Sequence, residues 1–278
     1  MKNEEGEFKG VQGIKIFYQC WLPEITPKAV VQIIHGFAEH SSRYINVINE
    51  LVPKGYIIYA NDHRGHGKSE GERGYVDNFN QFIDDVKILF DIIKEKHPKL
   101  PIFMLGHSIG SFIAMHFAKK YENLLKGLIL SGSGIQVGGS GTNAIIRALG
   151  KLISKLAPHK RFATGLGTDF VSRDPEVVKA YATDPMVYYD VSSRLAAEMM
   201  NAASSIKKFA GTFKLPCLLQ SGSVDIAIIG ASKLAEILCM EDKTVKIYDG
   251  LFHEIYNEIE QDRKIVLKDL SDWLDKHI

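Results

Sequence analysis

The segment 101–120 constrains the fold more than any other part of the sequence. Four apolar residues after Pro101 indicate a buried strand, and the mainly apolar run from Phe112 onward indicates a helix. Between them stands Gly106-His107-Ser108-Ile109-Gly110, a G-x-S-x-G pattern in the context of a nucleophile elbow. Both glycines are needed because side chains two positions either side of the serine would collide across so tight a turn. The pattern predicts a serine hydroxyl exposed where a helix N-terminus can stabilise an oxyanion.

Length and composition are those of a globular α/β protein. The 278 residues suffice for one large domain with an insertion, and 45% hydrophobic with 24% charged residues is ordinary for a soluble chain. A net charge of +1 without any Lys/Arg block argues against nucleic-acid binding. The three cysteines, Cys20, Cys217 and Cys239, are too few for a disulfide framework and favour a reducing compartment.

Targeting and membrane-spanning segments are not expected. Residues 1–6 are acidic and lack an apolar stretch, so the sequence predicts no signal peptide. No apolar run approaches the roughly 20 residues that a spanning helix needs. We therefore expect a soluble, cytoplasmic protein whose contact with a membrane would be peripheral.

Strand and helix patterns alternate on both sides of one interruption. A hairpin is expected at 7–22, strands at 29–34, 56–60, 102–105, 128–131, 215–220 and 244–248, and helices at 43–52, 79–93, 231–240 and 258–276. Composition changes at Gly132, where a small-residue segment leads into mainly helical or irregular sequence. This order predicts a mostly parallel sheet with helices on both faces and an inserted cap. We expect 1–133 and 207–278 to form the core and 134–206 the cap.

An elbow serine needs a base and an acid, which in this architecture follow it in the order Asp/Glu, then His. His253 lies in a loop just after a strand, whereas His277 is the penultimate residue of the chain. The acid should end the preceding strand, as Asp225 does. Asp249 and Glu254 are rival carboxylates that we expect to be surface groups. The sequence predicts a triad of Ser108, Asp225 and His253, in which the imidazole takes the serine proton and the aspartate stabilises the imidazolium.

The loop after the strand at 29–34 is expected to supply one of the two N–H groups of the oxyanion hole. One backbone N–H should come from this loop and the other from the residue after the serine, which gives the amides of Phe37 and Ile109. Glu39 and Arg43 are expected to be exposed beside the loop. They form either a solvated ion pair or a contact to substrate.

Asp62 to Ser69 invites two interpretations that we reject. Gly67-Lys68-Ser69 resembles the end of a phosphate-binding loop, but that loop needs a glycine where Asp62 stands. His63 and His66 beside Asp62 match no metal-site spacing, so a polar turn network is expected. The sequence predicts neither a metal nor a cofactor.

The segment 142–157 has two interpretations. Its apolar residues fall on one helical face, with lysines and an arginine opposite. Such a basic amphipathic helix can lie on an anionic membrane surface. It can equally pack its apolar face over the active site, and both hold if the helix forms the mouth of an acyl-chain tunnel.

Three motifs resemble one known family: HGFAEHSSRY at 35–44, DHRGHGKSEGER at 62–73 and GHSIG at 106–110. They look like the monoacylglycerol lipase and lysophospholipase group of α/β-hydrolases, and Tyr181 to Pro185 is similar to that family's cap. The resemblance implies the α/β-hydrolase fold, the same triad and oxyanion amides, and Glu39, Arg43 and Tyr181 near the glycerol head group. The family usually has glycine where Ala38 and Ser111 stand.

These observations predict a cofactor-free serine hydrolase of single-chain lipid esters, most of all monoacylglycerols. The alternatives within enzymes are a lysophospholipase, a general carboxylesterase or a thioesterase. Outside enzymes, the alternative is a ligand-binding module on the same fold, since a fold does not dictate function.

Overall fold

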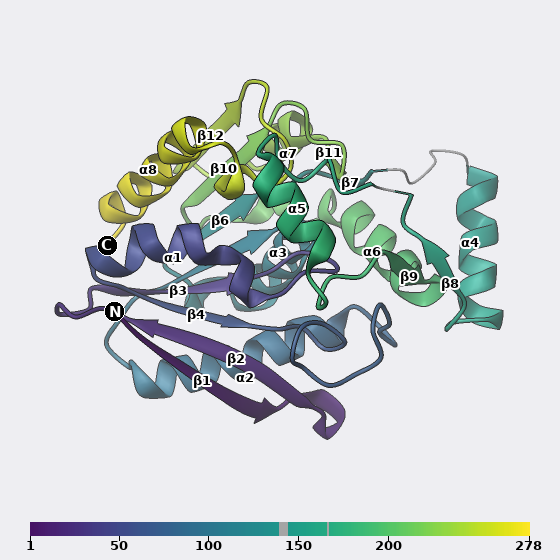
Figure 1. The fold of residues 1–278 in the computed structure, drawn as a ribbon, viewed down its shortest axis with the longest axis horizontal. Helices are drawn as coiled ribbons and strands as arrows, with labels where there is room; N and C mark the ends of the chain where they lie inside the picture. The colour runs from purple at the N-terminus through teal and green to yellow at the C-terminus, as the bar shows by residue number, and fades with distance from the viewer. Residues whose placement is uncertain (139–143, 166) are drawn as a thin grey trace.

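A central sheet of eight strands organises the protein (Figure 1). The computed structural model describes residues 1–138, 144–165 and 167–278, with the backbone alone for 144–149. Five neighbouring strand pairs are parallel, and β1 and β2 extend the sheet antiparallel at one edge. In sheet order the strands are β1 (Lys2–Lys9), β2 (Lys15–Leu22), β4 (Tyr56–Asn61), β3 (Ala29–Ile34), β5 (Ile102–His107), β6 (Gly127–Ser131), β10 (Cys217–Gly222) and β12 (Lys243–Tyr248).

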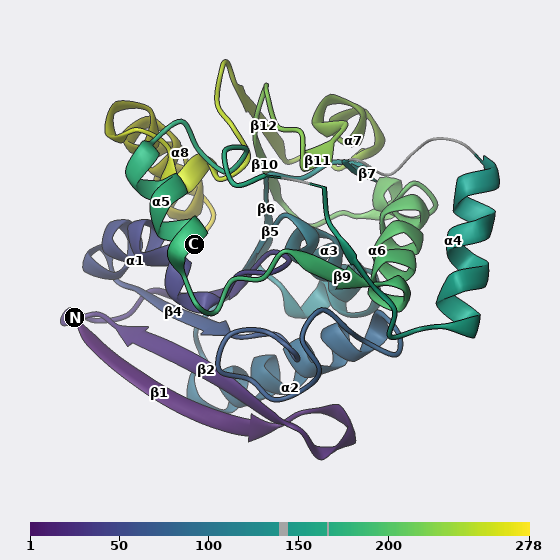
Figure 2. The same cartoon turned by 45° about the vertical axis from the view of Figure 1, so that its right-hand side comes forward.

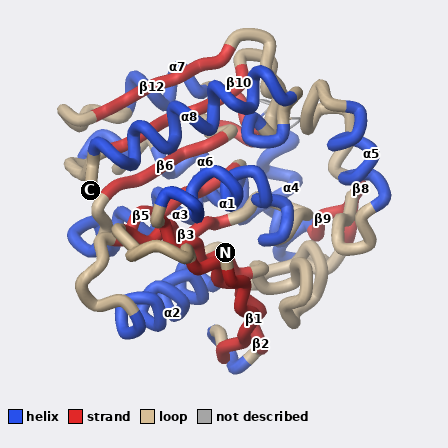
Figure 3. Tube along the Cα trace, turned by 60° about the vertical axis from the view of Figure 1, so that its left-hand side comes forward, coloured by secondary structure: helices blue, strands red, loops and turns tan. Residues whose placement is uncertain are grey.

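Helices cover both faces of this sheet (Figure 3). On one face α1 (Ile45–Leu51) packs against β4, and α8 (Glu260–Lys276) packs against β10. On the other lie α2 (Asn80–Lys96), α3 (Ile109–Tyr121) and α7 (Ala231–Ile237). Since both faces are covered, the central strands β3, β4, β5, β6 and β10 are buried along their whole length, as their continuous apolar sequences require. The mostly parallel sheet with helices on both faces is confirmed.

The segment between β6 and β10 leaves the sheet and returns to it. It contains β7 (Gln136–Val137), α4 (Ala144–Leu156), β8 (Arg161–Ala163), α5 (Pro175–Thr183), β9 (Asp190–Ser192) and α6 (Ser193–Ile206). Helix α6 packs on α3 of the core, and α4 packs on α6 at one end of the molecule (Figures 1 and 2). Strand β7 pairs with β11 (Ile228–Ile229), which follows β10.

Several element bounds differ from the sequence prediction. The hairpin begins at Lys2 and not at residue 7. The prediction missed the first residues of β1 because this polar strand is exposed along most of its length and gives no apolar signal. The helix expected at 43–52 is divided into a 3₁₀ turn (Ser41–Tyr44), α1 and a second 3₁₀ turn (Val52–Lys54), which contains Pro53. The remaining 3₁₀ turns are Val11–Gly13, Glu122–Leu124, Ala210–Thr212 and Ile255–Asn257.

Helix α2 begins where the polar residues before it can cap it. Asn78 Oδ1 accepts from the Asn80 N–H at 3.1 Å, and Gln81 Oε1 accepts from the N–H groups of Asp77 and Asn78 at 3.0 and 3.4 Å. The first bond satisfies a donor that the helix start leaves open, and the other two hold the residues that lead into the helix. In the part of the chain that the structure describes, no helix combines the length and the apolar character needed to cross a membrane.

Candidate active site

The turn at Ser108 holds the serine in a backbone conformation that L-residues rarely adopt. Its φ is 55° and its ψ −127°, and its N–H donates to the Ser131 carbonyl at 3.0 Å. The flanking glycines are needed for contact distance. A Cβ on Gly106 would lie 2.4 Å from the Gly110 carbonyl oxygen, and one on Gly110 would lie 2.1 Å from the Ile34 carbonyl oxygen. A strained serine therefore stands between β5 and α3 only because both glycines are present.

His253 and Asp225 meet although they lie on different loops. His253 follows β12 and Asp225 follows β10, and His253 Nδ1 is 2.7 Å from Asp225 Oδ2. The N–H groups of Ala227 and Ile228 donate to Asp225 Oδ1 at 2.8 and 3.1 Å, which fixes the carboxylate. Burial alone would lower the pKa of His253, but the Asp225 carboxylate outweighs it and the pKa lies above the ordinary value. The contact with Asp225 engages Nδ1 and leaves Nε2 of the same ring for another partner.

The rival groups lie elsewhere or have other partners. Asp249 is exposed and accepts from Ser223 Oγ at 3.2 Å. His277 is held at the end of α8 by the Trp273 carbonyl and by Asp242, at 2.6 and 2.9 Å. Neither belongs to the described lining of the cavity that contains Ser108 and His253.

Ser108 and His253 line one cavity of about 600 Å³, within the range of small-molecule sites. Phe37 and Ile109, which carry the two candidate oxyanion amides, line it as well. Most of its wall is apolar and comes from the segment between β6 and β10, including Ile153, Phe162, Phe170, Val171, Tyr188, Val191, Ala196, Met199 and Met200. The arrangement suits a ligand with a long apolar part and its reacting group beside the serine.

The loop after β3 is fixed by a carboxylate from its own end. Glu39 Oε1 accepts from the Gly36 N–H at 2.6 Å and from the Tyr44 hydroxyl at 2.8 Å. Ala38, between them, has a φ of 64° in the left-handed region. That conformation explains why a glycine would be favoured here and costs an alanine about 1 kcal/mol.

The prediction that Glu39, Arg43 and Glu254 are exposed is wrong. Their side chains are 5%, 8% and 5% exposed, and they form one ionic cluster. Arg43 Nη2 donates to the two oxygens of Glu254 at 2.8 and 2.6 Å, while Arg43 Nε lies 3.3 Å from Glu39 Oε2. The guanidinium also stacks on the Tyr181 ring at 4.6 Å. Burial removes both carboxylates from water, and the positive charge of Arg43 between them offsets part of that desolvation cost.

The three residues predicted to contact substrate differ in their access to the cavity. Glu39 and Tyr181 line it, as does the neighbouring Glu254. Arg43 is not among its described lining residues and contacts these three side chains from behind. Burial and the neighbouring Glu254 raise the pKa of Glu39 above its ordinary value in spite of the Arg43 charge. The polar end of the cavity thus presents carboxylates rather than a guanidinium.

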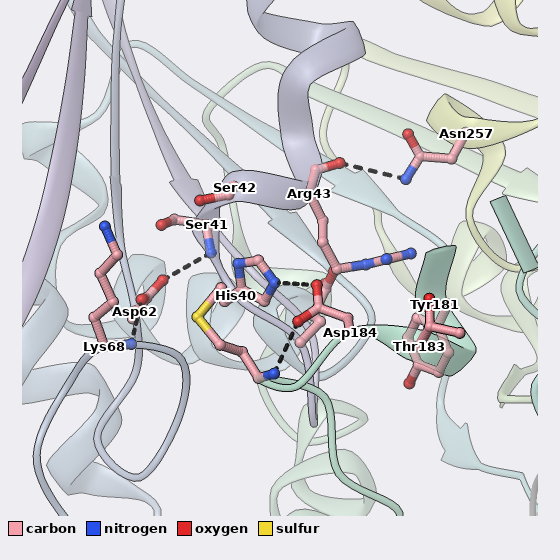
Figure 4. Close-up of polar contacts among 12 residues, drawn as sticks. His40, Ser41, Ser42, Arg43, Asp62, Lys68, Tyr181, Thr183, Asp184 and Asn257 are labelled. Carbon is pink, nitrogen blue, oxygen red and sulfur yellow. Dashed lines mark hydrogen bonds and ion pairs between the residues drawn. The ribbon is translucent and has the colours of Figure 1, made fainter. Parts of the chain in front are cut away.

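A second contact that the sequence did not predict ties the same loop to the inserted segment (Figure 4). His40 Nε2 lies 2.8 Å from Asp184 Oδ2, just after α5, and Asp184 Oδ1 accepts from the Met186 N–H at 2.8 Å. Asp62 anchors the other side of the loop by accepting from the N–H groups of Ser41 and Lys68, each at 2.8 Å. One feature of the sequence indicates these contacts: Asp62 and Asp184 each stand close to glycine or proline residues, which form turns.

The histidines of the 62–69 loop form a buried polar network. His63 Nε2 lies 3.0 Å from the His35 carbonyl, and His66 Nε2 lies 2.5 Å from the Tyr188 hydroxyl. Burial lowers the pKa of His63 to about 4 and that of His66 to about 3, so both rings are neutral near pH 7. Over the described residues no group of three or more His, Cys, Asp or Glu side chains could hold a metal ion.

The side chains of α4 are described only from Gly150 onward, so the predicted apolar contacts of 142–149 lie outside the described residues. Gly150 and Ile153 line the cavity, while Leu152 and Leu156 are 51% and 77% exposed. Lys151 and Lys155 are exposed as well. The last two turns of α4 therefore face both the cavity and solvent.

The mostly parallel sheet, with a tight strand-to-helix turn at Ser108, is the fold of the α/β-hydrolases. Residues 25–260 match the family described as "Serine aminopeptidase, S33", and the chain belongs to that family.

Relatives of known name cover nearly the whole chain. A monoacylglycerol lipase of Mycolicibacterium smegmatis is 36% identical over 99% of this chain and 98% of its own length. The human monoglyceride lipase is 30% identical over 94% of this chain and 87% of its own length. A solved structure of a Paleococcus ferrophilus monoacylglycerol lipase superimposes with a TM-score of 0.81 at 28% identity, over all of both chains. The predicted resemblance to this group is confirmed.

Proposed function

We propose that this protein is a serine hydrolase that cleaves the carboxylic ester of monoacylglycerols to a fatty acid and glycerol. One observation carries the proposal: Ser108 and an aspartate-bound His253 line a largely apolar cavity whose polar end holds carboxylates. The names of the relatives support the same substrate. The reaction needs no cofactor.

In the proposed mechanism, Ser108 Oγ attacks the ester carbonyl while His253 Nε2 takes its proton. Asp225 stabilises the imidazolium and holds the tautomer with a proton on Nδ1. The amides of Phe37 and Ile109 donate to the tetrahedral oxyanion. The imidazolium then protonates the departing glycerol oxygen, and water, deprotonated by the same imidazole, releases the fatty acid and restores Ser108.

The charge of the cavity supports a neutral alcohol over a phosphate head group. Glu39 and Glu254 line it, and none of its described lining residues is Lys or Arg. A glycerol hydroxyl can donate to a carboxylate, whereas a phosphate there would meet two carboxylates whose neighbouring cation, Arg43, is already paired with both and is not among the described lining residues. This favours monoacylglycerol over lysophospholipid. We propose that Glu39 and Tyr181 lie beside the glycerol, with Arg43 supporting them.

A substrate panel with the Ser108→Ala variant as control tests the proposal. It contains a long-chain monoacylglycerol, the matching lysophosphatidic acid and lysophosphatidylcholine, an acyl thioester, a short-chain ester and an amino-acyl arylamide. We expect the highest kcat/KM for the monoacylglycerol, and Ser108→Ala should lose turnover to the residual left by binding and the oxyanion hole. A kcat/KM for a lysophospholipid or the arylamide above that for the monoacylglycerol would show that the proposed substrate is wrong. Failure of a fluorophosphonate to label Ser108 in the folded protein would instead favour a binding module.

We further propose that 134–206 acts as a cap whose outer surface meets the membrane that supplies the substrate. Leu152, Leu156 and Phe162 are exposed apolar groups on α4 and β8, and Lys151 and Lys155 are exposed beside them. Apolar insertion and attraction to anionic lipid would then act together. Sedimentation with vesicles containing phosphatidylserine, at low and high salt, tests this. Leu156→Asp should reduce the fraction of protein that sediments with the vesicles. Equal sedimentation of the wild type and Leu156→Asp would exclude the proposed contact of the cap with the membrane.

A further inference from the structure

The carbonyl group of Ser108 is held by two donors from a single residue. Ser111 donates its backbone N–H to the Ser108 oxygen at 3.0 Å and its hydroxyl to the same oxygen at 2.6 Å. Ser111 is fully buried in the first turn of α3, so water does not compete for this oxygen. The strained serine therefore has its carbonyl fixed by a side chain as well as by the helix.

The hydroxyl of Ser111 is itself oriented by a second serine. Ser111 Oγ lies 2.7 Å from Ser133 Oγ, which is also fully buried. Because a carbonyl can only accept, the single proton of Ser111 points to Ser108, and Ser133 must donate to Ser111. Ser133 lies two residues beyond Ser131, the acceptor of the Ser108 N–H. One short segment after β6 thus anchors both sides of Ser108.

The position of the Ser108 oxygen determines the direction of the next N–H. The peptide unit between Ser108 and Ile109 is planar, with its N–H pointing opposite to its C=O. As the first residue of α3, Ile109 has an N–H without a partner inside the helix, and the residue lines the cavity. Holding the oxygen therefore aims this N–H at the cavity.

We propose that Ser111, oriented by Ser133, is a positioning residue that aligns the Ile109 N–H with the oxyanion of the transition state. The inference rests on the proposed function, in which Ser108 is the nucleophile and Ile109 supplies an oxyanion donor. Ser111 touches no substrate, since its hydroxyl is engaged by Ser108 and Ser133. Its contribution should appear in the chemical step and not in substrate binding, because the oxyanion forms only in the transition state.

A bond of this kind can also be merely structural, and the chain offers a matched control. Ser204 Oγ, on α6, donates to the carbonyl of Asn201 three residues earlier at 3.0 Å, in an exposed position away from the cavity lining. It makes the same kind of bond as Ser111, from a hydroxyl to the carbonyl three residues earlier, but at an exposed position where the peptide plane serves no site. Comparing Ser111→Ala with Ser204→Ala separates positioning from the ordinary effect of removing such a bond.

The test measures kcat and KM for a monoacylglycerol, together with the affinity for two inhibitors. A long-chain boronic acid forms a tetrahedral adduct with the serine, whereas an ether analogue of the substrate reports ground-state binding. In Ser111→Ala we expect kcat and boronate affinity to fall together by about three- to tenfold, the range set by one neutral hydrogen bond. KM and ether affinity should stay within about twofold. Ser133→Ala should repeat this pattern with a smaller loss, and Ser204→Ala should match the wild type.

The possible outcomes separate this inference from the proposed function. If the wild type hydrolyses esters and Ser111→Ala has an unchanged kcat, the positioning role is wrong while the function stands. A parallel loss of ether affinity would equally overturn it, because the effect would then be structural. If Ser111→Ala fails to fold, Ser133→Ala, which leaves the Ser108 oxygen with a less well-oriented donor, decides in the same way. Absence of ester hydrolysis in the wild type would refute the proposed function itself.

Discussion

Replacing Arg43 by methionine tests the buried ionic cluster most directly. The substitution keeps an unbranched apolar side chain but removes the cation that lies between Glu39 and Glu254 and contacts both. Breaking one partner out of a buried ion pair costs about 3–5 kcal/mol, because the remaining charge stays without compensation. The lost stacking on Tyr181 adds to this. At about 2–4 °C per kcal/mol for a protein of this size, the melting temperature should fall by about 6–20 °C.

The loss should depend on pH in a defined direction. Glu39 already has a raised pKa in the folded protein, and removing the guanidinium raises it further. A carboxyl with a higher folded than unfolded pKa favours the folded state at low pH, and that contribution is lost as pH rises through the folded pKa. The deficit of Arg43→Met should therefore be larger at pH 8 than at pH 5. Adding Glu254→Gln removes one of the two facing carboxylates and should recover part of the loss.

Urea and thermal unfolding at both pH values, followed by tryptophan fluorescence, measure these differences. Lys264→Met is the control, because Lys264 forms an exposed i,i+4 pair with Glu260 at 2.6 Å that solvent screens, and its melting temperature should hardly change. A melting temperature for Arg43→Met within about 2 °C of wild type at pH 8 would refute the reasoning. So would a deficit that is equal at both pH values, or a double variant less stable than Arg43→Met.

Three further predictions concern the turn, the oxyanion loop and the base. Activity should be lost as pH falls through the raised pKa of His253, and Asp225→Asn should shift this limb of the kcat/KM profile to lower pH and reduce kcat by up to about 10⁴-fold. Gly110→Ala places a Cβ 2.1 Å from the Ile34 carbonyl oxygen, so soluble yield and melting temperature should both fall sharply. Ala38→Gly removes the strain of a positive φ and should leave stability unchanged or raise it by up to about 1 kcal/mol. Ala38→Val should lower stability by roughly 1 kcal/mol or more, because a β-branched residue is more strained at such a φ. Thermal melts distinguish these last two variants.

Features encoded locally were predictable from the sequence. The elbow was found because a buried strand, a glycine-flanked serine and a helix adjoin in the chain, and each is visible without knowledge of the fold. The order of serine, acid and base then left few candidates. The structure brings His253 and Asp225 to 2.7 Å, while the catalytic roles of the three residues stay predictions.

Features that depend on distant pairing were not predictable. Arg43 and Glu254 are 211 positions apart, and each alone reads as a surface charge. Only when the 3₁₀ turn before α1 meets the loop before α8 do they become buried partners. The short strands of 134–206 were equally hidden, because β7, β8 and β9, with two or three residues each, carry too little periodicity to be recognised, whereas the apolar face of 142–157 did indicate the helix that became α4.

The cavity wall has two origins in the chain, and this has a consequence for how the protein could be re-engineered. Glu39 and Glu254 belong to loops of the sheet, whereas Tyr181, Phe162, Met199 and most of the apolar wall belong to the segment between β6 and β10. Under the proposed function, tolerance for the length of the tail would depend mainly on the inserted segment, whereas selectivity for the leaving alcohol would depend on both stretches. Grafting that segment from another hydrolase should change the preference for tail length more than the preference for the alcohol.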